Sequence, residues 1–126
     1  DKEKKSKVGC DIQENREVPY SFVRKYFSVW EQRFILGKQH RSEQEDAFCR
    51  CWTLRESFMK ATRYGMKLRL HTFEIQMKEG YPELTKIPKQ IEDTYYLKEY
   101  FLDVSYHVAV CATNREFAEE IQKVEL

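Results

Sequence analysis

The chain has 126 residues and a formal net charge of +1, because 22 Lys and Arg residues nearly balance 21 Asp and Glu residues. This length fits one domain with a modest core, and an aromatic content of 14% argues against disorder. The charges are interspersed without a basic arm, so a nucleic-acid interface is not expected. No apolar run approaches the roughly 20 residues of a membrane span, and no secretory signal is visible.

Four cysteines are present, at positions 10, 49, 51 and 111. They show no C-x-x-C or Cys/His zinc spacing, and Cys49 and Cys51 would point about 200° apart on a helix. Each lies among apolar residues, which predicts reduced, buried cysteines in a cytoplasmic protein. A disulfide is the alternative that the sequence leaves open.

Residues 1–7 form a charged run that predicts a solvated tail or linker, and residues 8–126 are expected to form a single domain. Val8 to Ile12 alternates apolar with small or polar residues, which indicates a strand. Gly9 would allow another part of the backbone to approach this strand closely. Asp11 is expected near the end of the strand.

Two short helices are predicted next. Pro19 suits the first turn of a helix with one apolar side. The second helix runs from Ser28 to Leu36, begins with a capping box made by Ser28 and Glu31, and ends at Gly37. The apolar side of the first helix carries Phe22, Val23, Tyr26 and Phe27.

A long central helix is predicted from about Ser42 to Tyr64, with a capping box of Ser42 and Glu45 and a left-handed C-cap at Gly65. At 100° per residue, one narrow apolar stripe faces the core. Its members are Ala47, Cys51, Leu54, Phe58 and Ala61. The opposite side carries Trp52, Glu56 and Lys60 at i, i+4 and i+8.

The second half of the chain changes to a period of two. His71 to Lys78 predicts a strand, followed by a turn from Glu79 to Pro82. Tyr95–Leu102 and Tyr106–Ala112 predict a β-hairpin. Asn114 would cap a short helical turn, and residues 121–126 would form an edge strand or a frayed end. Helices first and strands later indicate an α+β fold, with helices packed on a small antiparallel sheet.

Asp11 and Glu56 supply two carboxylates from separate elements, which is what Mg²⁺ requires of a protein when water and phosphate complete its shell. Lys60, one turn after Glu56, could meet a phosphate oxygen. The alternative is an ordinary helical ion pair between Glu56 and Lys60, contributing about 0.3–0.5 kcal/mol. Trp52 considered alone is more typical of a core residue.

The two segments together resemble the paired signature of the 4′-phosphopantetheinyl transferases. Val8-Gly9-Cys10-Asp11-Ile12 is similar to the family pattern of glycine and aspartate between hydrophobic residues. Trp52-Thr-Leu-Arg-Glu56-Ser-Phe-Met-Lys60 is similar to its W-x-x-K-E-[S/A]-x-x-K motif. Gly65, Leu68, Leu70 and the strand Tyr106–Ala112 resemble the C-terminal half of the surfactin-synthetase-activating (Sfp-type) branch. The resemblance covers residues 8–125.

This resemblance implies transfer of the phosphopantetheine arm of coenzyme A to a serine of an apo acyl or peptidyl carrier protein, with release of 3′,5′-ADP. It implies Mg²⁺ held by Asp11 and Glu56, with Lys60 on the phosphate. Glu56 or a metal-bound water would take the serine proton. Trp52 would support the substrate arm or the helix, and Arg55 would contact the cofactor. The carrier protein could dock on Phe22, Tyr26, Phe27 and Trp30. The alternative, for most of these residues, is a role in the core.

Three departures from the family pattern bear on this expectation. Gln13 stands where a second carboxylate is usual, so its amide would face the metal without bringing charge. Arg55 replaces the usual lysine. The first half of the two-half Sfp architecture is missing from these residues, so the site would be completed by that half or by self-association. A non-catalytic half-domain that binds carrier protein or coenzyme A is the alternative function.

Overall fold

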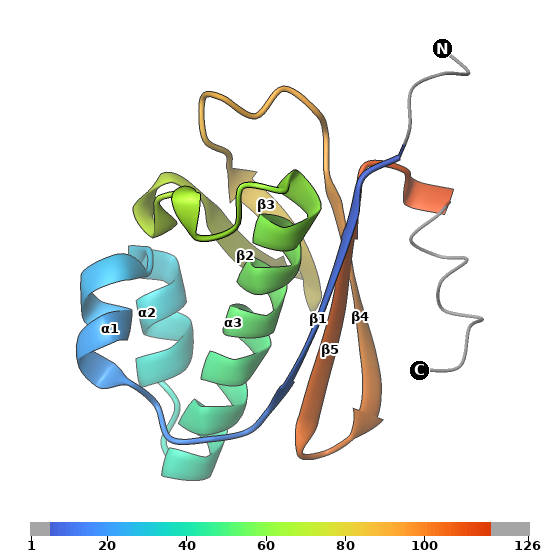
Figure 1. Ribbon diagram of the computed structural model, residues 1–126. Coiled ribbons are helices and arrows are strands. Elements are labelled where there is room, and N and C mark those ends of the chain that lie inside the picture. The colour runs from blue at the N-terminus through green and yellow to red at the C-terminus, as the bar shows by residue number, and fades with distance from the viewer. Residues whose placement is uncertain (1–5, 117–126) are drawn as a thin grey trace.

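The computed structural model describes residues 6–116 and has an α+β fold, as predicted (Figure 1). The elements in chain order are β1 (Val8–Glu14), α1 (Tyr20–Tyr26), α2 (Val29–Leu36), α3 (Arg41–Thr62), 3-10 turns at Gly65–Lys67 and Leu70–Thr72, β2 (Glu74–Lys78), β3 (Tyr81–Lys86), β4 (Tyr96–Asp103) and β5 (Tyr106–Ala112). None of the helices in residues 6–116 combines the length and the apolar composition that a membrane span requires.

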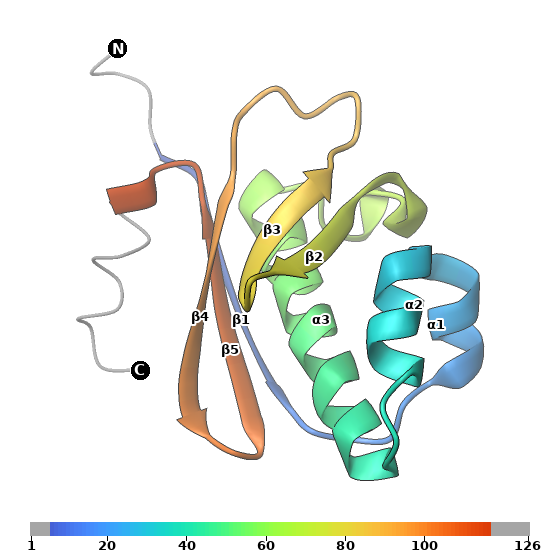
Figure 2. The ribbon, with the colours of Figure 1, turned by 180° about the vertical axis from the view of Figure 1, so that it is seen from behind.

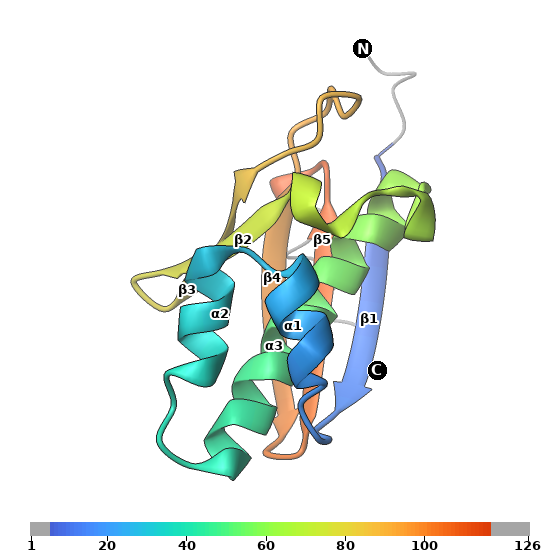
Figure 3. The same ribbon diagram turned by 90° about the vertical axis from the view of Figure 1, so that its left-hand side faces the viewer.

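The strands form two antiparallel sheets. One has three strands in the order β1-β5-β4, and the other pairs β2 with β3. The smaller sheet lies beside β4 (Figure 2). Helix α3 packs on β1 and β5, while α1 and α2 cover the opposite side of α3 (Figure 3). The central helix is therefore buried between two layers, which explains why so much of its surface is apolar.

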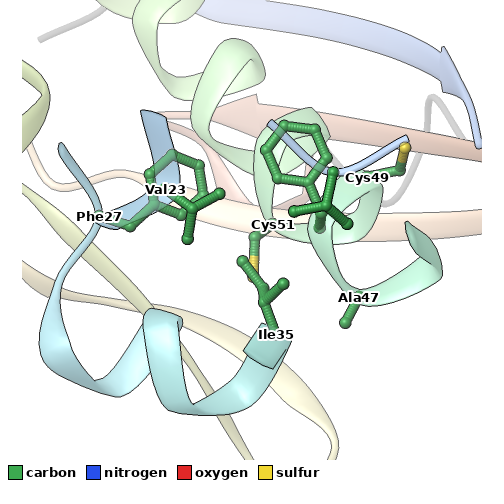
Figure 4. Packing of buried hydrophobic residues seen from close by; sticks show 8 residues of the cluster. Val23, Phe27, Ile35, Ala47, Cys49 and Cys51 are labelled. Carbon is green, nitrogen blue, oxygen red and sulfur yellow. The ribbon is translucent and has the colours of Figure 1, made fainter. Parts of the chain in front are cut away.

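The predicted apolar stripe of α3 is confirmed, since all five of its residues are at most 3% exposed. At the N-terminal end of this stripe, Ala47 and Cys51 pack with Val23 of α1, with Phe27 at its C-cap and with Ile35 of α2 (Figure 4). All four cysteines are free, as expected. The prediction that each is buried is wrong for Cys10, which lies on the exposed face of β1.

Gly9 allows β1 to lie directly against α3. A Cβ atom at this position would be 2.3 Å from the backbone nitrogen of Ala61 and 2.4 Å from the backbone oxygen of Ser57. No rotamer change can relieve a clash with backbone atoms. The expectation that Gly9 permits close backbone approach is therefore confirmed, and it sets the distance between Asp11 and the helix that carries Glu56.

Gly9→Ala is expected to lower the free energy of unfolding by about 1–3 kcal/mol, because the added methyl group forces the strand away from the helix. Urea denaturation measures this change. Cys10→Ala, on the exposed face of the same strand, serves as the control and should shift stability by less than about 0.5 kcal/mol. Equal losses in the two variants would show that close packing at Gly9 is not the cause.

The ends of α3 differ from the prediction. The helix begins at Arg41 after an N-cap at His40, whose backbone N–H donates to the Glu43 side chain at 3.2 Å. The predicted capping box of Ser42 and Glu45 is therefore wrong by two residues. Arg63, with φ of 68°, is the left-handed C-cap in place of Gly65. The capping box of Ser28 and Glu31 at α2 is confirmed.

Among the described residues of the second half, β3 is a strand that was not predicted. β2 starts at Glu74 because residues 70–72 form a 3-10 turn, and β3 includes Pro82 opposite Met77. Proline is tolerated in an edge strand, where its missing N–H costs no ladder bond. The β4–β5 hairpin is confirmed, with a register shift between Tyr100 and Asp103. The strand predicted for residues 121–126 lies outside the described residues.

Candidate active site

The carboxylate of Asp11 lies at the contact between β1 and α3. Asp11 is in the middle of β1, opposite Ala109 of β5, and only 6% exposed. Its Oδ1 accepts a hydrogen bond from Lys60 Nζ at 2.7 Å, and its Oδ2 accepts one from Gln13 Nε2 at 2.7 Å. The expected position near the strand end is therefore not observed, and the two sequence motifs meet directly through this aspartate.

Glu56 is half-buried near Asp11, and no described residue donates a hydrogen bond to its carboxylate. Burial, followed by the negative charge of Asp11, raises the pKa of Glu56. The cations Lys60 and Arg16 offset part of this effect. The ionised carboxylate of Glu56 is therefore only partly compensated and accepts no hydrogen bond from a described residue, so a cation placed beside it would be favourable.

Lys60 of α3 lies beside both acidic residues, Asp11 of β1 and Glu56 of α3. Its hydrogen bond with Asp11 is the largest cause of a raised pKa, and Glu56 adds to it. The side chain of Lys60 is half exposed. The ammonium group therefore stays charged at neutral pH and remains accessible to an anion from solvent.

Gln13 completes this cluster but is oriented by Arg16. Its amide NH₂ donates to Asp11, while its Oε1 accepts a hydrogen bond from Arg16 at 2.8 Å. The amide oxygen of Gln13, which was expected to face a metal, is thus bound by the Arg16 cation. A direct role of Gln13 as a ligand would require this amide to turn.

The donor set still fits a hard divalent cation. Among residues 6–116, no group of three His, Cys, Asp or Glu side chains gathers around one point. The pair of Asp11 and Glu56 is what remains, and Mg²⁺ is commonly held by one or two carboxylates together with water and phosphate oxygens. The unpartnered carboxylate of Glu56 is the observation that supports this fit.

Trp52 lies on the same helix but packs into the core between α1 and α3. Its ring centroid is 5.5 Å from that of Phe22, 6.2 Å from that of Phe27 and 6.4 Å from that of Phe48. These contacts match a role in holding the helix in place, which was one of the two roles implied for Trp52.

Arg55 is not brought to the cluster. Its side chain is 0% exposed and forms an ion pair with the equally buried Glu31, with the shortest N–O distance at 2.6 Å. The guanidinium also donates to the carbonyl oxygens of Leu70 and Phe73, and it lies over the ring of Phe27 at 4.6 Å. The expectation that Arg55 contacts the cofactor does not fit this placement, and we assign it a structural role.

Glu31 is the residue that the sequence analysis missed. It was recognised only as part of the capping box, where its Oε1 accepts from the backbone N–H of Ser28. In the fold it also accepts from Arg55 and from the backbone N–H of Ile75, which joins α2, α3 and β2. The capping box already explains an acid at position 31. The sequence therefore offered no further reason to expect Glu31 in a tertiary contact.

Comparison with known proteins places this geometry in context. A family model described as the 4′-phosphopantetheinyl transferase superfamily matches residues 7–111. The 4′-phosphopantetheinyl transferase Sfp of Bacillus subtilis is 30% identical over 117 residues, covering 93% of this chain and 51% of that protein. The transferase ffp of Bacillus subtilis gives the same identity and coverage. The chain thus spans about half the length of the curated relatives it matches, as resemblance to one half of an Sfp-type enzyme predicts.

Solved structures share the fold. A holo-(acyl-carrier-protein) synthase from Bacillus anthracis, in complex with CoA (3′,5′-ADP), aligns with a TM-score of 0.70 at 18% identity, covering 84% of this chain and 93% of that one. The Thermotoga maritima holo-[acyl-carrier-protein] synthase aligns with a TM-score of 0.63 at 23% identity, covering 84% of this chain and 61% of that one. The predicted fold class is therefore confirmed.

Proposed function

This chain belongs to the 4′-phosphopantetheinyl transferase superfamily, and we propose that it transfers the phosphopantetheine arm of coenzyme A to a serine of an apo acyl or peptidyl carrier protein. The observation that carries this proposal is the convergence of Asp11, Glu56 and Lys60, with an unpartnered acid beside a buried one. Related synthases have been solved in complex with CoA, which supports the choice of donor.

In this reaction the serine oxygen forms a bond to the β-phosphorus of coenzyme A, and the bond from that phosphorus to 3′,5′-ADP breaks. Asp11 and Glu56 would hold Mg²⁺, which neutralises charge on the pyrophosphate when bound. Lys60, half exposed and charged, would bind a phosphate oxygen and supply a proton to the leaving group.

Glu56 would accept the proton of the attacking serine. Its raised pKa makes it a stronger base than an ordinary carboxylate once ionised, while the nearby charge of Lys60 favours the ionised form. Gln13 would orient Asp11 through its amide NH₂. Glu56 and Gln13 would both act where β1 contacts α3.

The carrier protein would dock beside this site on α1 and the start of α2. Phe22, Tyr26 and Trp30 are half-buried and could contact a carrier helix, whereas Phe27 is only 4% exposed and belongs to the core. Because the matched relatives are about twice as long, we propose that a second half or a second copy of the chain completes the nucleotide end of the site.

Lys60→Ala is expected to raise the KM for coenzyme A about tenfold, because a charged hydrogen bond to phosphate is lost. The KM for the carrier protein should change much less. Steady-state kinetics with each substrate varied in turn measure the two constants. Lys78→Ala, a lysine on β2, is the matched control and should leave both constants unchanged. A larger effect on the carrier KM than on that for coenzyme A would contradict the phosphate role.

A non-catalytic half-domain is the second candidate function, favoured by the half-length match and by the neutral Gln13. It predicts binding of coenzyme A or carrier protein without transfer. Incubating the chain with apo carrier, coenzyme A and Mg²⁺, alone and with the first half of the Bacillus subtilis Sfp relative, separates these possibilities. Transfer under either condition supports the enzyme, while binding without transfer under both supports the half-domain.

A further inference from the structure

The loop between β1 and α1, at the lower end of Figure 1, carries Arg16, to which the proposed transfer assigns no role. Two contacts anchor the backbone beside this residue. The backbone N–H of Asn15 donates to the carbonyl oxygen of Ser105 at 2.8 Å, and Cys49 Sγ of α3 donates to the carbonyl oxygen of Glu14 at 3.4 Å. Arg16 therefore follows a backbone that is held by both the β4–β5 turn and the central helix.

The side chain of Arg16 lies on an aromatic ring. Its guanidinium carbon is 5.6 Å from the ring centroid of Phe48, which is only 1% exposed. Phe48 stacks in turn on Trp52, with ring centroids 6.4 Å apart and an interplanar angle of 9°. A cation over an aromatic face is attracted by the electrons of the ring. The guanidinium of Arg16, although exposed to solvent, is therefore held in a defined place beside the proposed site.

Gln13 connects this guanidinium to Asp11. Its Oε1 accepts from Arg16 at 2.8 Å, and its Nε2 donates to Asp11 Oδ2 at 2.7 Å. A guanidinium has donors alone and an ionised carboxylate has acceptors alone, so these two neighbours determine the orientation of the amide. A carboxylate at position 13 could accept from Arg16 but could not donate to Asp11. The amide that departs from the family pattern is thus matched to Arg16.

The orientation of Asp11 depends on few groups. Lys60 donates to Oδ1 at 2.7 Å and Gln13 to Oδ2, and no other described side chain donates to this carboxylate. Asp11 is 6% exposed, so water can replace a lost donor only in part. Hydrogen bonds that orient a ligating carboxylate are commonly worth 10–100-fold in metal affinity or activity.

We propose that Arg16 is a positioning residue. By holding the amide oxygen of Gln13, it keeps the amide NH₂ on Asp11 and so fixes the orientation of the Asp11 carboxylate at the site. Arg16 acts through Gln13 and touches neither the cofactor nor the carrier protein. The inference rests on the function proposed above.

The first test measures the exchange of the Gln13 side-chain NH₂ protons with water by NMR, which requires no transfer activity. The signals are identified by their absence in Gln13→Ala. Exchange should be faster in Arg16→Ala, because the released amide leaves Asp11, and Arg16→Lys should recover part of the protection. Arg16 contacts the amide oxygen, so a change at the NH₂ group reports the Asp11 end of the bridge. Unchanged exchange in Arg16→Ala would overturn the proposal.

The control for this test is Lys38→Ala. Lys38 also places a cation over an aromatic ring, 4.5 Å from the centroid of Phe34. Its removal takes away an equal charge and an equivalent contact, and should leave the exchange of the Gln13 protons unchanged. Faster exchange in this variant as well would show that any lost surface cation has the same effect, which would overturn the proposal.

The second test is a double-mutant cycle in the transfer reaction. Arg16→Ala should lower kcat about tenfold and leave the KM for coenzyme A and for the carrier protein within about twofold. In the Gln13→Ala background, Arg16→Ala should have no further effect beyond about twofold. An equal loss in both backgrounds would overturn the proposal, as would a large rise in either KM, which would indicate direct contact with phosphate or carrier. If the parent chain transfers nothing even with the first half of the Sfp relative, the proposed function fails, and the exchange rates alone decide the role of Arg16.

Discussion

Glu56→Gln is expected to lower the rate of phosphopantetheine transfer by about 10³-fold or more, because one of two charged metal ligands and the proposed base are lost together. The fold should persist, since no described residue donates a hydrogen bond to this carboxylate. Transfer is measured from the mass of the carrier protein, and folding from thermal denaturation of the same preparation.

Glu45→Gln is the control for this variant, because it removes an equal charge from the same helix away from Asp11. It should retain full transfer activity. Asp11→Asn should reproduce the loss seen with Glu56→Gln. Full activity in either Glu56→Gln or Asp11→Asn would contradict the assignment of Asp11 and Glu56 as metal ligands.

The pH dependence of stability gives an independent check on Glu56. Because the folded state raises its pKa, the contribution of Glu56 to stability is fully present below the unfolded pKa near 4.5 and is lost as pH rises through the folded value. Glu56→Gln should therefore be as stable as the parent chain or more stable at pH 7. A clear loss of stability at pH 7 would mean that the ionised carboxylate has a stabilising partner.

Arg55→Met is expected to lower the free energy of unfolding by about 3–5 kcal/mol, because it leaves the fully buried Glu31 carboxylate without its cation. It also removes the donors to the carbonyl oxygens of Leu70 and Phe73. Denaturant unfolding measures the loss. Arg55→Lys should recover only part of it, because an ammonium group lacks the planar fork that reaches both Glu31 and the carbonyl groups.

The double variant Glu31→Gln with Arg55→Met tests whether the two residues act as a pair. It should be less destabilised than the sum of the single variants, because the unpaired buried charge is gone. Lys78→Met breaks an exposed pair with Glu83 and should cost less than about 1 kcal/mol. Additive losses at Glu31 and Arg55 would show that their pairing does not stabilise the core.

The sequence was sufficient to predict the features that depend on local periodicity. The 3.6-residue pattern identified α3 and its buried stripe, and alternation identified β1 and the β4–β5 hairpin. The predicted approach at Gly9 is confirmed by the backbone distances. The hydrogen bond from Lys60 to Asp11 was not predicted, since Lys60 was expected to meet a phosphate oxygen or Glu56.

Features that depend on distant parts of the chain could not be predicted. Pro82 indicated a turn, yet an edge position lets it join β3. Arg55 was expected to contact the cofactor, but in the core it binds a partner 24 residues earlier and two carbonyl groups. A local contact between side chains was also missed: Gln13 was expected to face a metal, whereas Arg16, three residues later, donates a hydrogen bond to its amide oxygen.

The most direct test of the central claim is the intact mass of an apo carrier protein after incubation with this chain, coenzyme A and Mg²⁺, with and without the first half of the Sfp relative. We predict a gain of one phosphopantetheine arm that disappears with EDTA and in Glu56→Gln. No gain under either condition, or a gain that persists with EDTA or in Glu56→Gln, would contradict a metal-dependent transferase site at Asp11 and Glu56.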